Sequence, residues 1–245
     1  DLRGGADELM QKLEIEGKNS PADLLVSVDA GRLYRAKEKD LLQKVDHDTL
    51  NSRVPERYRD PDGFWYGLTY RARALAYHSD RMDEGAITTY EGLADDKLED
   101  RLLIRSSQNV YNQSMIASVL AHQGEETTMK WLNGLVDNLA RKPKGGDRDQ
   151  IKAVASGEGD LAVVNTYYLA KMLQSENEAE VEAAENMEIV FPNQDGRGAH
   201  VNISGVGVTK HAPHKENALR LMQYLTSKEA QAMYANQNYE YPVRS

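Results

Sequence analysis

Two adjacent tyrosines, Tyr167 and Tyr168, follow an apolar run in the stretch GDLAVVNTYYLAKM. Neighbouring side chains of a β-strand point to opposite faces, so a tyrosine pair inside a strand cannot easily act together. The apolar run predicts a buried strand over 160–165, which places the pair at a strand-to-helix turn. There the backbone can direct both hydroxyls to one place. Two phenolate oxygens are hard, anionic donors that suit a highly charged cation.

Other candidate groups lie in polar segments next to predicted elements. Arg71 and Arg73 are spaced by two on an extended segment, so their side chains share one face. Two guanidinium groups on one face predict a bound anion or a carboxylate partner. RSSQNVYN, residues 105–112, is a polar turn before a helix predicted over 113–124. Serines that precede a helix supply hydroxyls and lie near free backbone donors, a ready anion site.

Each of these groups, taken alone, also has an ordinary structural explanation. A tyrosine pair can pack its rings and leave its hydroxyls in water. Paired arginines are often ion-pair residues, serines before a helix are often caps, and an aspartate beside a glycine is often a turn residue. The residues that these alternatives concern are Asp29, Arg71, Arg73, Ser106, Ser107, Tyr111, Tyr167 and Tyr168.

Composition limits the partners and the chemistry. The chain has 245 residues, a net charge of −9 and a pI near 5.2, so long-range electrostatics oppose binding to nucleic acid or to an anionic membrane. No apolar stretch is long enough to span a membrane, so no membrane insertion is expected. With no cysteine, thiolate catalysis and cysteine metal sites are excluded. The scattered histidines form no zinc motif, and no P-loop or GxSxG sequence occurs.

Alternation of predicted strands and helices indicates an α/β fold. A helix over 6–17, a strand from 22 with a turn at Asp29 and a helix over 32–43 open the chain. The stretch from Thr166 begins a helix that runs into an acidic, solvated segment. Two long extended segments, 65–77 and 200–209, can each cross between lobes. They predict two lobes with a cleft, lobe one from 1–76 plus 199–245 and lobe two, inserted, from 77–198.

Several stretches resemble the periplasmic ferric-ion-binding proteins, the substrate-binding components of bacterial iron(III) ABC transporters. The resemblance implies a type II periplasmic-binding-protein fold with a hinge, an interlobe cleft that closes over Fe(III), and tyrosine ligands from the inserted lobe. The stretches that carry it are SPADLLVSVDAGRL, YRDPDGFWYGLTYRARALAY, RSSQNVYNQSMIASVLAHQGEE, NLARKPKGGDRDQIKAVASGEGDLAVVNTYYLAKML, GRGAHVNISGVGVTKHAP and NYEYPVRS.

The resemblance also implies a ligand set. Tyr167 and Tyr168 match the paired tyrosine ligands, and Tyr111 matches a third tyrosine found in the branch that uses carbonate or no anion. Asp29 lies near a loop where some members supply a carboxylate ligand. For the synergistic anion, carbonate or another, the resemblance implies an arginine and an assisting loop. Arg71 or Arg73 matches that arginine, and Ser106 and Ser107 lie in the loop that can assist.

Family members open with a further strand and helix before ADELMQKL and continue beyond YEYPVRS, so the resemblance implies that both segments, and one metal ligand, are missing here. The implied function is binding of Fe(III) and its delivery to an inner-membrane ABC permease, by a periplasmic monomer without enzymatic activity. Two alternatives stay open. One is a receptor of the same fold for an anion or a small organic cation; the other is an α/β hydrolase or transferase, for which no nucleophile and base are evident.

Overall fold

The computed structural model describes residues 2–83 and 85–244, and the chain forms two compact units. The first unit is Asp1–Tyr70 with Asn202–Ser245, and the second is Arg71–Val201. The chain passes from one unit to the other within β2 (Tyr66–His78) and again at the start of β6 (Val201–Val208). From the sequence, these divisions are expected after residues 76 and 198.

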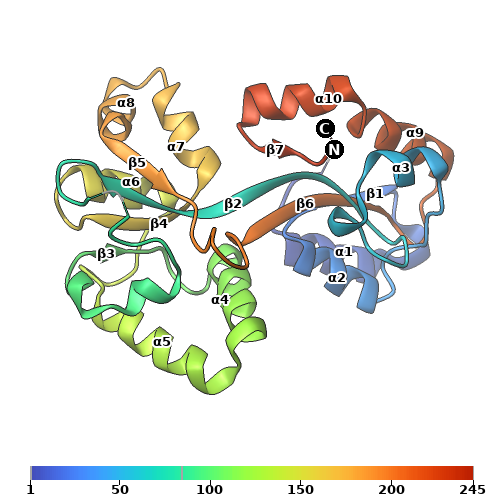
Figure 1. Ribbon diagram of the computed structural model, residues 1–245. Helices are drawn as coiled ribbons and strands as arrows, with labels where there is room; N and C mark the ends of the chain where they lie inside the picture. Colours follow the sequence, from blue (N-terminus) through green and yellow to red (C-terminus); the bar gives the residue numbers. More distant parts are fainter. Residues whose placement is uncertain (1, 84, 245) are drawn as a thin grey trace. The chain divides into compact units, whose positions relative to one another are not determined.

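The second unit is built on a mixed sheet with the order β5-β2-β4-β3 (Figure 1). β3 (Leu102–Leu103) runs parallel to β4 (Leu161–Asn165), and β2 is antiparallel to both β4 and β5 (Met187–Val190). Every residue of β4 is buried. A strand covered on both faces needs a continuous apolar run, which explains the LAVV sequence.

Helices cover both faces of this sheet (Figure 1). Leu161 and Val163 of β4 pack in one cluster with residues of α4 (Val110–Gln123) and α5 (Glu125–Asp137). Ala162 and Val164 pack in a second cluster with α6 (Asp147–Ala155), α7 (Thr166–Leu173) and α8 (Glu178–Glu185). Alternate residues of a strand face opposite sides, so one short strand supplies both cores. Because β3 and β4 are parallel, the turns that lead from them into α4 and α7 lie at the same edge of the sheet.

The acidic stretch after α7 was predicted from the sequence to be solvated, and this prediction is wrong for part of it. It forms α8, whose Ala183 and Ala184 are buried in the second cluster. Glu180 is also buried, and its carboxylate accepts hydrogen bonds from Lys152, Arg148 and Ser175. Cationic partners allow a glutamate to be buried. The two alanines give the helix a small apolar face, which the high proportion of acidic residues in the sequence does not indicate.

The first unit is also a sheet between helices. β1 (Leu24–Val28) is antiparallel to β6, and the first part of β2 pairs with β7 (Tyr241–Pro242). One core cluster contains residues of α1 and α2, and the other contains residues of α3 and α9. The helices of this unit are α1 (Ala6–Glu16), α2 (Ala30–Glu38), α3 (Asp48–Arg53), α9 (Lys215–Leu225) and α10 (Lys228–Met233).

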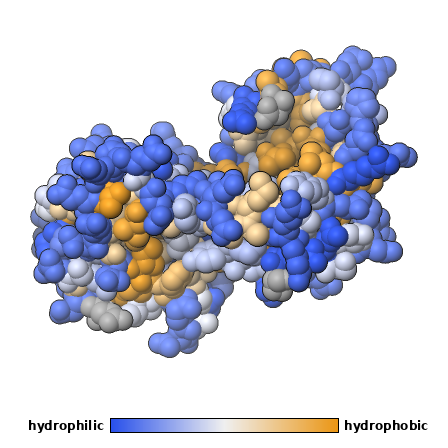
Figure 2. All heavy atoms as spheres, turned by 90° about the horizontal axis from the view of Figure 1, so that it is seen from above, coloured by the Kyte–Doolittle hydropathy of each residue, from blue (hydrophilic) through white to orange (hydrophobic). Residues whose placement is uncertain are grey.

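The surface is consistent with the charged composition. Hydrophilic residues predominate on the face drawn in Figure 2, where they surround limited apolar areas. Within residues 2–83 and 85–244, no helix combines the length and the apolar character needed to cross a membrane.

Asp160, just before β4, joins two arginines of the second unit. Its carboxylate accepts from Arg81 Nε at 2.8 Å and from Arg101 Nε at 2.7 Å. Burial acts to raise the pKa of Asp160, but the hydrogen bonds and charges of the two arginines outweigh it and hold that pKa below its usual value. Because the folded pKa lies below the unfolded one, this stabilisation is complete above the unfolded pKa of about 4 and is lost as pH falls through the folded pKa.

We therefore expect Asp160→Asn to lower the free energy of unfolding by about 2 kcal/mol at pH 7. Urea unfolding of wild type and variant at a series of pH values measures the difference, which should shrink below pH 4 as Asp160 is protonated. A difference that stays constant down to pH 2 would show that the ion pairs do not stabilise the unit.

Candidate metal centre

The two adjacent tyrosines lie in the first turn of α7, directly after β4. Asn165 is the last residue of β4 and the N-cap of the helix, which begins at Thr166. Tyr167 is 8% exposed and Tyr168 is half-buried. Their ring centroids are 4.2 Å apart with an interplanar angle of 31°. The strand-to-helix turn expected from the sequence is present, and it keeps the two phenols side by side.

Tyr111 reaches the same place from another helix. It lies in the first turn of α4, where Asn109 caps the helix by accepting the Tyr111 N–H at 3.0 Å. The helix begins at Val110, earlier than the residue 113 expected from the sequence, because Asn109 rather than a serine is the cap. Since the turns into α4 and α7 share one edge of the sheet, residues distant in sequence come together there.

The three phenols converge on the hydroxyl of Tyr167. Burial is the largest cause that raises the pKa of Tyr167, far above the usual value for a phenol. The nearby phenols of Tyr111 and Tyr168, which are hydrogen-bonded to Tyr167, raise it further. The Tyr167 phenol is therefore neutral near pH 7 in the absence of a cation.

Cationic side chains surround these rings. The Arg71 Cζ lies 5.9 Å from the Tyr167 ring centroid, and the Lys171 Nζ lies 5.3 Å from the same centroid. The Arg105 Cζ lies 5.6 Å from the Tyr111 ring centroid. Such distances allow cation–π attraction. Lys171 is one helical turn beyond Tyr167, so the helix itself sets that contact.

Arg73 has a different environment from Arg71. It is buried, and its Nη1 donates to Asp147 Oδ2 at 2.6 Å, while its Nη2 donates to Asn112 Oδ1 at 2.7 Å. The sequence predicted an anion or a carboxylate beside the two arginines, and Asp147 is that carboxylate for Arg73. Its guanidinium is already used to hold the elements of the unit together.

The two serines lie in the loop between β3 and α4. The Ser106 hydroxyl accepts the Gln108 N–H at 3.2 Å and so supports a local turn. Ser107 is exposed, and its carbonyl accepts from Gln113 Nε2 at 3.2 Å. Both serines lie in the segment that leads to Tyr111, with Ser107 four residues and Ser106 five residues before it in the sequence.

Two buried polar atoms beside the tyrosines have no hydrogen-bond partner within the described part of the chain. They are the Asn165 Nδ2 and the Thr166 Oγ1, at the start of α7. Asn165 is 1% exposed, and no side chain caps the helix there. Buried polar groups normally have partners, and a free helix N-terminus favours anions. These donors were not identified from the sequence.

Asp29 lies in the first unit, at the N-terminus of α2. It has a φ of 81°, in the left-handed region. Its Oδ1 accepts the Gly31 N–H at 2.8 Å, and its Oδ2 accepts from Asn202 Nδ2. The carboxylate is buried and serves as a helix cap.

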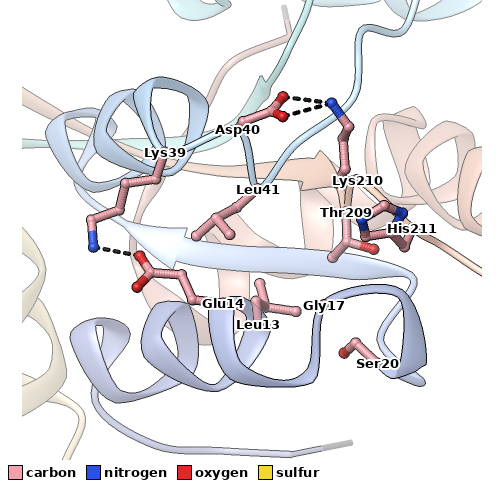
Figure 3. A pocket seen from close by; sticks show the side chains of 10 residues that line it. All are labelled: Leu13, Glu14, Gly17, Ser20, Lys39, Asp40, Leu41, Thr209, Lys210 and His211. Carbon is pink, nitrogen blue, oxygen red and sulfur yellow. Dashed lines mark hydrogen bonds and ion pairs between the residues drawn. The ribbon is translucent and has the colours of Figure 1, made fainter.

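A surface pocket of about 240 Å³ in the first unit contains none of the predicted site residues (Figure 3). Its charged groups are paired with one another, Lys39 with Glu14 and Lys210 with Asp40. Within residues 2–83 and 85–244, no three histidine or carboxylate side chains are grouped so that they could hold a metal ion.

Comparisons with known proteins agree with this architecture. Residues 19–245 match the family described as bacterial extracellular solute-binding protein. Iron uptake protein A1 of Synechocystis sp. is 50% identical over 242 residues, which cover 99% of this chain and 67% of that protein.

Solved structures give the same result. The Trichodesmium protein IdiA (FutA), in complex with iron and citrate ligands, matches with a TM-score of 0.95 and 45% identity, over 99% of this chain and 77% of that one. The ferric binding protein from Campylobacter jejuni matches with a TM-score of 0.94 and 38% identity, over 99% and 77% of the two chains.

These structures confirm the expected class, an α/β protein of the two-lobe periplasmic-binding type. The chain belongs to the bacterial extracellular solute-binding proteins.

Proposed function

We propose that the second unit binds a ferric ion through the phenolate oxygens of Tyr111, Tyr167 and Tyr168. The observation that carries this proposal is the convergence of three phenols, from the starts of two helices, on one point. Fe(III) is a hard ion that prefers anionic oxygen donors. Three phenolates offset its three positive charges. The relatives named as iron uptake and ferric binding proteins support the same ligand.

An anion completes the coordination of the ion. Arg71 lies beside Tyr167, and Asn165 Nδ2, Thr166 Oγ1 and the start of α7 offer donors next to the same ring. Carbonate or a carboxylate such as citrate has acceptor oxygens for these donors. The citrate in the complex of the Trichodesmium protein supports an anion of this kind. Arg73, which is occupied by Asp147, acts by positioning. Roles for Ser106, Ser107 and Asp29 stay predictions from the sequence.

The protein would act in the periplasm as a monomer and deliver iron to an ABC permease in the inner membrane. Membership of the solute-binding family supports a role in capture and delivery rather than in catalysis. Binding in a cleft that closes by a hinge stays a prediction from the sequence.

Titration of the iron-free protein with ferric citrate tests the proposal. A broad visible absorption band from phenolate-to-iron charge transfer should rise and saturate at about one equivalent, as expected for a single hard-ion site. A folded protein that gives no band would contradict ferric binding by tyrosine. In that case, saturable binding of phosphate or of a polyamine under iron-free conditions would support the alternative receptor.

A further inference from the structure

Asp147, the first residue of α6, has a fully buried carboxylate close to the proposed iron site. Burying an ionised carboxylate is costly unless cations and hydrogen-bond donors surround it. Its Oδ2 accepts from Arg73 Nη1 at 2.6 Å and from the Asn165 N–H at 2.8 Å. Its Oδ1 accepts from Arg105 Nη1 at 3.2 Å.

The three donors belong to the three segments that carry the site. Asn165 immediately precedes the turn with Tyr167 and Tyr168. Arg105 begins the loop that leads to α4, and its guanidinium lies beside the Tyr111 ring. Arg73 is two residues from Arg71 on the same strand. The Asp147 carboxylate therefore contacts β2, the loop before α4 and the turn before α7. These three segments carry the proposed ligands and anion donors of the second unit.

Asn112 closes this network. Its Oδ1 accepts from Arg73 Nη2, and its Nδ2 donates to the Arg105 carbonyl at 2.7 Å. Asn112 follows Tyr111 directly in α4. Arg73, which donates to Asp147, therefore also donates to Asn112 in the first turn of α4, the helix that carries Tyr111.

We propose that Asp147 is a positioning residue of the iron site, which sets the placement of Tyr111 relative to Tyr167 and Tyr168. This inference rests on the proposed function, because it concerns the geometry of the same phenols. Groups that hold metal ligands in place commonly change metal affinity when they are replaced. Asp147 acts through the turns into α4 and α7 and does not contact the ion.

Asp160 supplies a matched control. It also joins two arginines of the second unit, and it lies at the other end of β4 from Asn165. Its partners, Arg81 and Arg101, are outside the segments that carry the phenols. Asp147→Asn and Asp160→Asn therefore each remove a carboxylate that is paired with two arginines. Only Asp147→Asn is expected to disturb the turns that lead into α4 and α7.

The test compares ferric citrate titrations of wild type, Asp147→Asn and Asp160→Asn, below the unfolding temperature of all three. We expect Asp147→Asn to lower the ferric association constant about 10- to 100-fold and to shift the charge-transfer band. Asp160→Asn should keep the wild-type band and affinity although it also loses stability. Asp147→Asn with wild-type band and affinity would overturn the positioning role alone, whereas a wild type without a band would overturn the proposed function and this inference together.

Arg105→Gln keeps the test decisive if Asp147→Asn does not fold. The Arg105 side chain is 17% exposed and makes the longer of the two arginine contacts with Asp147, so its replacement disturbs the core less. We expect a smaller loss of affinity in the same direction, together with a band shift. An unchanged band and affinity in folded Arg105→Gln would overturn the inference.

Discussion

Tyr167→Phe is expected to abolish the ferric charge-transfer band and to lower the ferric association constant by more than about 100-fold. Replacing a residue that only holds metal ligands in place typically lowers metal affinity by no more than that. Tyr167 receives hydrogen bonds or close contacts from both other phenols, so its oxygen is the centre of the donor set. Tyr168→Phe and Tyr111→Phe should each weaken the band and the affinity, because each removes one anionic donor. Visible absorption and competition with citrate measure both quantities.

Tyr66→Phe is the matched control. Tyr66 is a buried tyrosine of the first unit, and its hydroxyl is hydrogen-bonded to the Val45 carbonyl and the Asn51 side chain. Its replacement removes a bonded phenol hydroxyl without touching the three candidate ligands. We expect a loss of stability with an unchanged band. Wild-type iron binding by folded Tyr167→Phe would exclude the tyrosine site.

Iron binding is expected to release protons and to weaken steeply in acid. Burial and the neighbouring phenols raise the pKa of Tyr167, so its phenol is protonated before binding and must lose its proton to coordinate the ion. For each proton released, the association constant falls about tenfold per unit decrease in pH. Three phenols would give a change of up to about 1000-fold per unit.

A weakly buffered titration with an indicator dye counts the released protons, with corrections for iron hydrolysis and for citrate. Tyr111→Phe should release one proton fewer than wild type while it still binds iron. Affinity that is independent of pH between 6 and 8, or a wild type that releases no protons, would be incompatible with phenolate ligands.

Much of the fold follows from local patterns. The apolar run of β4 and the spacing of α5 and α9 predict their own elements, because burial requires that residues on the covered faces be apolar. The start of α4 was predicted too late, since the cap is Asn109 and the serines before it form a separate turn. The segment of α8 was predicted to be solvated because it is rich in acidic residues, whereas its contact with the core is made by two alanines.

The candidate site was predictable only in part. The tyrosines of NTYY and of SSQNVYN were predicted to be ligands through a family resemblance, and the structure brings their side chains together. Arg105, Asp147, Asn165 and Lys171 were missed. GGDRDQ reads as a charged loop, and only its contacts show that Asp147 is buried. A buried aspartate at a helix start has the same local sequence as an exposed one.

The sequence by itself determined the class of fold, the segments that carry the tyrosines and the absence of cysteine chemistry, because periodicity and composition are local properties of the chain. Only the tertiary structure decided which charges meet. Arg71 and Arg73 are equivalent in sequence, yet Arg73 is bonded to Asp147 and Asn112 while Arg71 lies beside Tyr167. Such a difference depends on partners from distant segments, which the parallel pairing of β3 and β4 brings to one edge of the sheet.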